Sequence, residues 1–246
     1  MNSPATPASP TFSPLYRQIR ALITRGLESG EWRPGDIIPS EAELAERFGV
    51  SQGTVRKAID AMAVENLLVR RQGKGTFVAT HKEPGAFSRF LRLAANEGEL
   101  PAPTSIPLEC GRAKAGADVA RTLAVEAGAA IIIIRRLQRC ADVPAIFDEI
   151  YLPGELFPDL TLAILKSADM SLYSLFESRY GVCPIRADER LRAVSADRVS
   201  AGLLQVAEGS PLLLVERVTL TYGDKPVEWR RAYYSTQQFH YHNSLG

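Results

Sequence analysis

The sequence is poor in the residues that carry redox chemistry and metal ions. Its 246 residues include three cysteines, scattered and odd in number: Cys110, Cys140 and Cys183. Their spacing matches neither a metal site nor a disulfide framework, which is typical of a protein in a reducing interior. The three histidines fall in a predicted linker and tail: His81, His240 and His242. We therefore expect no metal and no cofactor.

Long hydrophobic runs and targeting signals are also absent. The longest apolar run, Ala129 to Ile134, is far too short to span a bilayer. The N-terminal segment from Asn2 to Pro10 has neither charge nor an apolar core, so it predicts a disordered tail over residues 1–12 rather than a signal peptide. These features predict a cytoplasmic protein without a membrane partner.

Charge is balanced overall but uneven along the chain. The net charge is +1, which by itself does not indicate a nucleic-acid partner. Residues 50–80, however, hold two acidic side chains, Asp60 and Glu65, against five basic ones: Arg56, Lys57, Arg70, Arg71 and Lys74. A local basic excess of this kind is what phosphate contacts require.

Residues 39–62 have the pattern of two short helices joined by a tight turn. Ser40 and Glu43 form a predicted capping box at the start of the first helix, and Gly49 ends it. Ser51 caps the second helix. Apolar residues recur at helical spacing in both: Leu44, Phe48, Val55, Ile59 and Met62. Helices joined so tightly cross steeply, as in a helix-turn-helix whose second helix enters the major groove.

A preceding helix and a following hairpin complete a winged helix. Ser13 and Pro14 predict an N-cap followed by proline at the first helical position. Leu68–Arg71 and Thr76–Val78 read as strands around the loop Gln72-Gly-Lys-Gly75. A helix-turn-helix pattern alone is also compatible with a solvated charged face. The three pieces in this order favour DNA binding.

Residues 14–79 resemble the N-terminal domain of the GntR family of bacterial transcription regulators. The resemblance rests on Pro39-Ser-Glu, Thr54-Val-Arg-Lys-Ala and Gln72-Gly-Lys-Gly-Thr-Phe-Val. Two positions that usually face DNA depart from the family, because Gln52 and Ala42 stand where arginine is frequent. Glutamine favours adenine over guanine. The predicted DNA-binding residues are Ser40, Glu41, Ser51, Gln52, Thr54, Arg56, Lys57, Arg70, Gln72, Gly73, Lys74, Gly75 and Thr76.

The remaining chain predicts a second domain of different character. The winged helix is expected over residues 13–79, a linker over 80–86, and an α+β domain over 87–242. Ala117–Gly128 resembles Ala196–Gly209, and each leads into an apolar strand and a second strand starting at Pro144 or Pro226. The two copies are offset by 79 to 82 residues. Two helix–hairpin units of this kind predict a pseudo-twofold α+β domain around one antiparallel sheet.

This second domain resembles the effector-binding UTRA domain of the HutC subgroup of GntR regulators, which has a chorismate lyase-like fold. The motifs are Arg136-Leu-Gln, Phe147-Asp-Glu-Ile-Tyr-Leu-Pro153, Ser171-Leu-Tyr173, Glu216-Arg-Val and Pro226-Val-Glu228. Such domains bind small, often anionic metabolites and supply dimer contacts. The resemblance implies the ligand candidates Ser88, Arg136, Asp148, Ser171, Tyr173, Glu228 and Tyr234.

Strand alternation adds two candidates. Arg136 and Gln138 project from one face of a strand, and Glu228, Arg230 and Tyr234 from one face of another. We expect Arg136 to contact an anion and Glu228 to accept a hydrogen bond from the effector. Many relatives have arginine at Gln138, so its amide favours a monoanionic or neutral effector over a dianionic phosphate. For each of these residues a purely structural role, as a charge on an exposed sheet face or as an aromatic ring in the core, is an equally good interpretation.

The resulting hypothesis is a homodimeric transcription regulator, with most relatives being repressors. Two winged helices would bind a two-fold symmetric operator, and the effector would alter their spacing or order. Two alternatives stay open: an enzyme of chorismate lyase-like fold fused to a DNA-binding domain, and a DNA-binding protein without an effector. The sequence has no nucleophile elbow and no glycine-rich phosphate loop, which argues against an enzyme.

Overall fold

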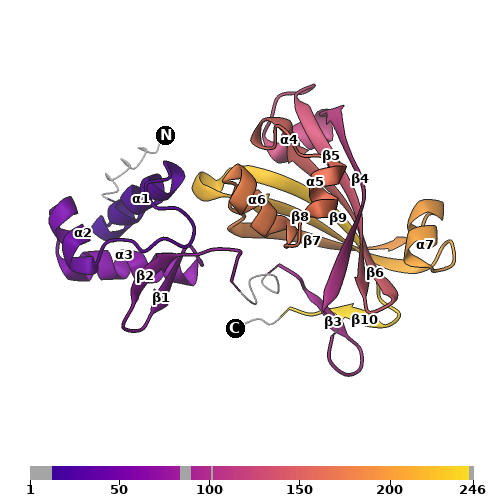
Figure 1. The fold of residues 1–246 in the computed structure, drawn as a ribbon, viewed down its shortest axis with the longest axis horizontal. Coiled ribbons are helices and arrows are strands. Elements are labelled where there is room, and N and C mark those ends of the chain that lie inside the picture. Colours follow the sequence, from indigo (N-terminus) through magenta and orange to yellow (C-terminus); the bar gives the residue numbers. More distant parts are fainter. Residues whose placement is uncertain (1–12, 84–89, 101, 244–246) are drawn as a thin grey trace, which may run out of the picture. The chain divides into compact units, whose positions relative to one another are not determined.

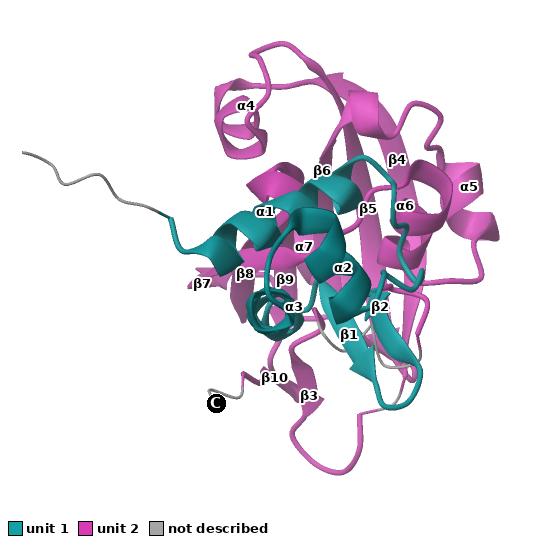
Figure 2. Ribbon diagram, turned by 90° about the vertical axis from the view of Figure 1, so that its left-hand side faces the viewer, with its two compact units in different colours: residues 1–79 teal, residues 80–246 magenta. Residues whose placement is uncertain are grey.

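The computed structural model describes residues 13–83, 90–100 and 102–243. The chain divides into two compact units, residues 1–79 and residues 80–246 (Figure 2). The predicted tail over residues 1–12 and residues 84–86 of the predicted linker over 80–86 lie outside the described residues. Thr80 and His81, which begin that linker, hydrogen-bond to Glu177 within the second unit.

The described part of the first unit contains three helices: α1 (Leu15–Glu28), α2 (Glu41–Phe48) and α3 (Gln52–Val64). The Ser40 hydroxyl accepts from the Glu43 N–H, and the Glu43 carboxylate accepts from the Ser40 N–H at 2.8 Å. Gly49 ends α2 with φ of 65°. The capping box and the glycine stop are therefore confirmed. Apolar side chains from all three helices form the core, including Ile19, Ile23, Leu44, Val55, Ile59 and Met62.

The start of the first helix differs from the prediction by one residue. Pro14 is the N-cap of α1, and no side chain caps the helix. The Ser13 carbonyl instead accepts a hydrogen bond from the Gln18 amide at 2.9 Å. The Ser13 cap is therefore wrong.

The wing is a hairpin of β1 (Leu68–Arg71) and β2 (Gly75–Val78). Leu68 pairs with Val78 and Arg71 with Gly75, so the turn contains residues 72–74. Gly73 and Gly75 have φ of 70° and 112°, a region that glycine enters without strain. A Cβ on Gly75 would lie 2.8 Å from the Ile37 Cδ1 atom. The glycines thus permit both the turn and its packing on Ile37.

The second unit is built on one antiparallel sheet of six strands in the order β4-β5-β6-β9-β8-β7. The strands are β4 (Pro103–Lys114), β5 (Ala130–Cys140), β6 (Val143–Pro153), β7 (Arg186–Ser195), β8 (Pro211–Leu220) and β9 (Pro226–Ser235). A small separate pair joins β3 (Leu93–Ala95) to β10 (Phe239–Tyr241). The predicted α+β class and single antiparallel sheet are confirmed (Figure 1).

The sheet order is symmetric about its centre, as the repeat predicts. Helix α4 (Ala117–Leu123) leads into β5 and β6, and α7 (Arg198–Leu204) leads into β8 and β9. Each helix is also preceded by a strand, β4 or β7, which the sequence repeat does not reveal. The strands β6 and β9 meet at the centre, where Asp148 pairs with Ala232. The two halves therefore bring Arg136 and Arg217 to related places on one sheet.

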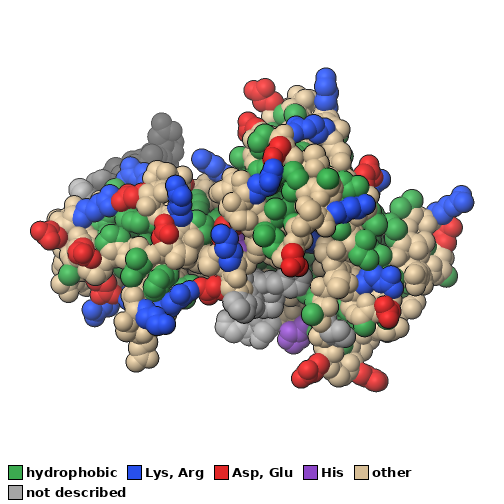
Figure 3. All heavy atoms as spheres, viewed as in Figure 1, with side chains coloured by type: hydrophobic (Ala, Val, Ile, Leu, Met, Phe, Trp, Pro, Cys, Tyr) green, Lys and Arg blue, Asp and Glu red, His purple; other side chains and the backbone are tan. Residues whose placement is uncertain are grey.

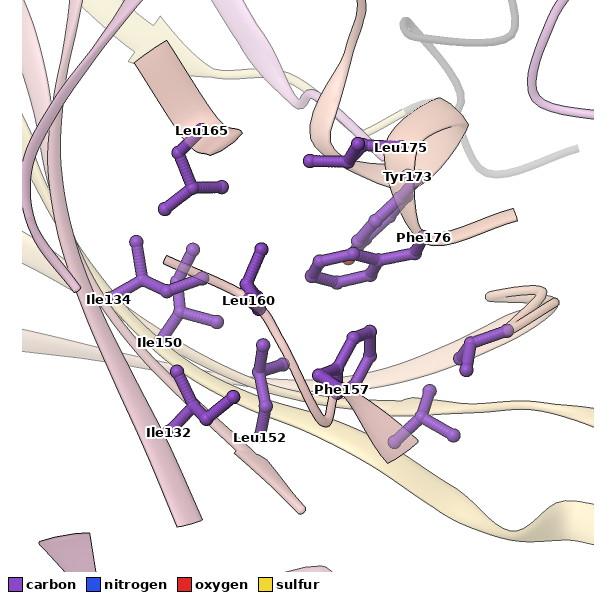
Figure 4. Close-up of a cluster of buried hydrophobic side chains, with 12 residues drawn as sticks. Ile132, Ile134, Ile150, Leu152, Phe157, Leu160, Leu165, Tyr173, Leu175 and Phe176 are labelled. Atoms are coloured by element: carbon purple, nitrogen blue, oxygen red, sulfur yellow. The ribbon is translucent and has the colours of Figure 1, made fainter. Parts of the chain in front are cut away.

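Different helices cover the two faces of this sheet. On one face, α5 (Leu162–Ser167) and α6 (Leu172–Tyr180) pack over Ile132, Ile134, Ile150 and Leu152. Figure 4 shows Tyr173, Leu175 and Phe176 of α6 in this cluster. On the other face, α4 packs near Ile131 and α7 near Leu137. Further along the α6 face, the alternating positions are polar, and these form the site below.

Candidate functional site

The outer face of α3 is polar and open to solvent. Gln52, Gly53, Arg56 and Lys57 are exposed, whereas Val55 is fully buried. Ser51 caps the helix by accepting from the Thr54 N–H, and its hydroxyl lies 2.9 Å from the Thr54 hydroxyl. Because α3 packs through its apolar face, its N-terminal turn presents Gln52 and Arg56 outward, where a recognition helix contacts base edges.

Glu41 joins the recognition helix to the wing. Its carboxylate accepts from Arg56 Nε at 2.9 Å and from Arg70 Nη2 at 2.8 Å, and Arg70 also bonds Asp60 at 2.8 Å. Partial burial raises the pKa of Glu41, but the hydrogen bonds and charges of Arg70 and Arg56 outweigh this and lower it. In the free protein, Glu41 thus orients both arginines and offsets their charge.

Other basic residues of this unit lie against aromatic rings. Lys57 Nζ is 4.6 Å from the Tyr16 ring centroid, and the Arg71 guanidinium is 4.4 Å from that of Phe77. On the face shown in Figure 3, basic and acidic side chains alternate rather than forming one basic patch. Among the predicted DNA-binding residues, Thr76 is only 9% exposed and so offers DNA little surface.

The second unit contains a pocket of about 450 Å³, including space open to solvent. It is lined by side chains from β5, β8, β9, α6 and the segments near residues 81 and 90: His81, Phe90, Leu91, Arg136, Gln138, Ser171, Leu172, Tyr173, Arg217, Arg230 and Tyr234. Three arginines and an amide thus face an otherwise aromatic and apolar cavity. Six residues of the predicted effector set meet here: Arg136, Gln138, Ser171, Tyr173, Arg230 and Tyr234.

Asp148 lies behind the lining and holds two of its donors. Its Oδ2 atom accepts from Arg136 Nε at 2.6 Å and from Gln138 Nε2 at 2.8 Å. Asp148 is fully buried. Burial raises the pKa of this carboxyl, but the charges of Arg136 and Arg230 outweigh that effect and lower it. Asp148 therefore acts as a buried counterion that fixes the Arg136 guanidinium at the pocket wall.

Glu228 has the same role for Arg230. It is fully buried and accepts from Arg230 Nη2 at 3.0 Å, from Tyr173 OH at 2.8 Å and from Thr219 Oγ1 at 3.2 Å. Although burial lowers the pKa of Arg230, the negative charge of Glu228 raises it well above its usual value. Neither Glu228 nor Asp148 belongs to the pocket lining, so the structure gives no support for Glu228 as a direct acceptor for the effector.

Arg217 is the third cation, and strand alternation in the sequence did not select it. Its Nε donates to Glu189 at 2.6 Å, and its guanidinium lies 5.7 Å from the Phe90 ring centroid. The internal repeat was the available signal, because it aligns Arg217 with Arg136. His81, Phe90, Leu91 and Leu172 also line the pocket without having been predicted. Ser88 lies outside the described residues.

Comparison with known families agrees with both units. The model of the bacterial regulatory proteins of the gntR family matches residues 15–78, and that of the UTRA domain matches residues 101–240. The chain belongs to the GntR family. Its combination of the two domains places this GntR regulator in the HutC subgroup. It is a transcription regulator, not an enzyme, with a DNA-binding helix-turn-helix and an effector-binding UTRA domain.

Individual relatives cover most of the chain. The GntR regulator is 30% identical to the HTH-type transcriptional repressor NagR of Bacillus subtilis, over 94% of this chain and 96% of that one. The crystal structure of a ligand-binding domain from Bordetella bronchiseptica, ascribed to a GntR-family regulator, is 48% identical with a TM-score of 0.63, covering 64% and 98%. PhnF from Mycobacterium smegmatis is 25% identical with a TM-score of 0.54, covering 93% and 99%.

Neither a membrane-spanning helix nor a metal site is found among the described residues. Every helix in this part of the chain is too short or too polar to cross a bilayer. Within residues 13–83, 90–100 and 102–243, histidine, cysteine, aspartate and glutamate form no group of three or more that is placed to hold a metal ion.

Proposed function

We propose that this GntR regulator is a homodimeric repressor that binds a two-fold symmetric operator in the cytoplasm and is controlled by a small organic anion. The observation that carries the proposal is the arginine-lined pocket on the α6 side of the sheet, in the same chain as an exposed recognition helix. The relative NagR is a transcriptional repressor, which supports repression as the sign of regulation. A coupling of about 1–3 kcal/mol between the sites would change operator affinity from severalfold to about a hundredfold.

The charge of the pocket favours an effector with one anionic group over an effector with two. Three guanidinium groups are each paired with a carboxylate: Arg136 with Asp148, Arg217 with Glu189 and Arg230 with Glu228. The network is therefore neutral, and a dianion would add two charges without compensation. Asp148 Oδ1 and Arg230 Nε are buried and have no hydrogen-bond partner among the described residues. Phe90, Leu91 and Leu172 suit an apolar body on that anion.

Replacement of Arg136 tests the pocket. Alanine here would also orphan the buried Asp148, so Arg136→Lys is the sharper variant, because it keeps the charge and removes the planar fork. We expect effector affinity to fall by about 1.5–3 kcal/mol, or roughly ten- to 150-fold, which is the contribution of a hydrogen bond to a charged group. Operator affinity without effector should stay at the wild-type value. Calorimetry over a panel of carboxylates and phosphate monoesters measures the first effect, with Arg198→Lys, at an exposed position of α7, as control. Equal affinities for all three proteins would place the effector elsewhere.

Replacement of Arg56 tests the recognition helix. We expect Arg56→Ala to weaken operator binding by about 1–3 kcal/mol if the guanidinium contacts a base. The fold should persist because Glu41 keeps its bond to Arg70. Gel-shift titration measures the affinity. Arg121→Ala, which removes another exposed arginine, paired with Asp118 in the other unit, is the matched control. If Arg56→Ala binds like the control, Arg56 does not contact DNA.

Gln52 is expected to select adenine in the operator. It is exposed at the first position of α3, and its amide can pair bidentately with the adenine edge, whereas arginine favours guanine. Selection of sites from a random DNA library should therefore yield an adenine-to-guanine change in each half-site for Gln52→Arg. Identical consensus sites for the two proteins would show that Gln52 reads no base.

A further inference from the structure

The two units join at Ala79 and Thr80, and each of these residues is hydrogen-bonded within its own unit. The Ala79 N–H donates to the Leu67 carbonyl at 3.0 Å, within the first unit. The next residue, Thr80, donates its hydroxyl to Glu177 Oε1, within the second unit. Consecutive residues are thus hydrogen-bonded within different units.

Glu177 is a buried acceptor for this junction. It lies on α6 and is 7% exposed. Its Oε1 accepts from the Thr80 hydroxyl, and its Oε2 accepts from the His81 N–H at 2.8 Å. A buried carboxylate is tolerated only while such donors satisfy it. We call Glu177 with Thr80 and His81 the Glu177 clamp.

The same helix forms a wall of the effector pocket. Ser171 caps α6 and lines the pocket together with Leu172 and Tyr173. The Ser171 and Ser174 hydroxyls lie 2.8 Å apart, and the Ser174 hydroxyl donates to the His81 carbonyl at 2.7 Å. The first two turns of α6 thus connect the pocket wall to both backbone groups of His81.

His81 also reaches the pocket with its ring. The ring centroid is 5.4 Å from that of Tyr173, which in turn lies 5.5 Å from the Arg230 guanidinium. The His81 Nε2 atom is 2.6 Å from the Pro184 carbonyl oxygen, and it must be the donor because a carbonyl only accepts. An effector that reaches Arg230 along Tyr173 therefore meets the His81 ring.

We propose that His81 is an effector-contacting residue and that the Glu177 clamp transmits its displacement to the DNA-binding unit. This inference rests on the proposed effector pocket. While the Glu177 clamp is formed, Thr80 and His81 keep the conformation that permits operator binding. Effector contact with His81 weakens the bonds to Glu177 and Ser174, and operator affinity falls. By thermodynamic reciprocity, operator binding weakens effector binding by the same factor.

Histidine ring signals in NMR spectra test the contact. The chain has three histidines, so the spectrum is simple, and His81→Gln identifies one signal. Benzoate supplies a carboxylate on an apolar body, and inorganic phosphate supplies an anion alone. We expect benzoate to shift the His81 signal while those of His240 and His242 stay in place. Benzoate binding that Arg136→Lys weakens, with no shift at His81, would overturn the contact.

Variants of the clamp test transmission without a ligand. Thr80→Val removes one donor at nearly constant shape, and Glu177→Gln replaces one acceptor oxygen by a donor. Thr104→Val is the matched control, since its hydroxyl donates to the Arg139 carbonyl at 3.4 Å from an exposed position of β4. We expect Thr80→Val and Glu177→Gln to lower hydrogen-exchange protection of the His81 amide about tenfold. Operator affinity should fall at least threefold, with no change in the control.

The outcomes separate the two proposals. If neither benzoate nor phosphate binds, the proposal of an anionic effector is wrong. The operator affinity and hydrogen exchange of Thr80→Val and Glu177→Gln then decide whether the clamp transmits a displacement. If Thr80→Val keeps wild-type operator affinity and wild-type protection at His81, transmission through the clamp is wrong, even where benzoate binds at Arg136. Since valine at Thr80 removes a single hydroxyl, this result stands even if Glu177→Gln does not fold.

Discussion

Replacement of Glu228 by alanine is expected to destabilise the second unit by about 3–5 kcal/mol, because it removes one partner of a buried ion pair. Glu228 is fully buried and accepts hydrogen bonds from Arg230, Tyr173 and Thr219. Without it, Arg230 keeps only Asp148 at 4.0 Å as a charged partner among the described residues. The substitution should therefore lower the free energy of unfolding of the second unit, whatever its effect on effector binding.

The two tryptophans allow the stability of each unit to be measured separately. Trp32 lies in the first unit and Trp229 in the second, so urea unfolding can be followed for each with the other replaced by phenylalanine. The Trp229 transition should move to lower urea, and the Trp32 transition should not. Glu208→Ala removes an exposed carboxylate and is the control. An unshifted Trp229 transition in Glu228→Ala would show that Arg230 does not depend on this counterion.

Operator affinity is expected to fall about 10³- to 10⁵-fold between 50 and 200 mM salt, the range for six to ten phosphate contacts. Each DNA-binding unit has five basic side chains in α3 and the wing, Arg56, Lys57, Arg70, Arg71 and Lys74, so the proposed homodimer has ten. Arg56 and Arg70 are bonded to Glu41 in the free protein. If Arg56 and Arg70 stay bonded to Glu41 in the complex, three basic side chains per unit remain to contact phosphates. The dimer then makes six phosphate contacts, which is the lower limit of the range.

Fluorescence anisotropy of a labelled operator over a salt series measures this slope. Lys74→Ala, at the exposed tip of the wing, should reduce the slope by about one for each phosphate that it no longer neutralises, or about two for a dimer. Lys166→Ala, exposed on α5 in the other unit, should leave the slope unchanged. A slope close to zero would contradict phosphate contacts as the source of affinity.

The DNA-binding unit was predictable because its signals are local. A capping box depends on residues three apart, a helix face on residues three or four apart, and a hairpin on its loop. Ser40, Gly49 and the wing glycines therefore appear in the structure as predicted. The helix start at Ser13 was wrong because a cap depends on where one hydroxyl points, and the neighbouring proline itself takes the cap position.

The α+β class and its pseudo-twofold sheet also followed from the sequence alone, because the repeat doubles a local pattern. Only the tertiary structure decided which polar side chains face the arginine-lined pocket. Asp148 and Glu228 alternate along their strands like pocket residues, yet they lie behind the lining because Arg136 and Arg230 cover them. Arg217 and His81 join the pocket because distant strands and the junction meet at α6. Strand periodicity assigns a side chain to a face, whereas burial within that face depends on neighbours far away in sequence.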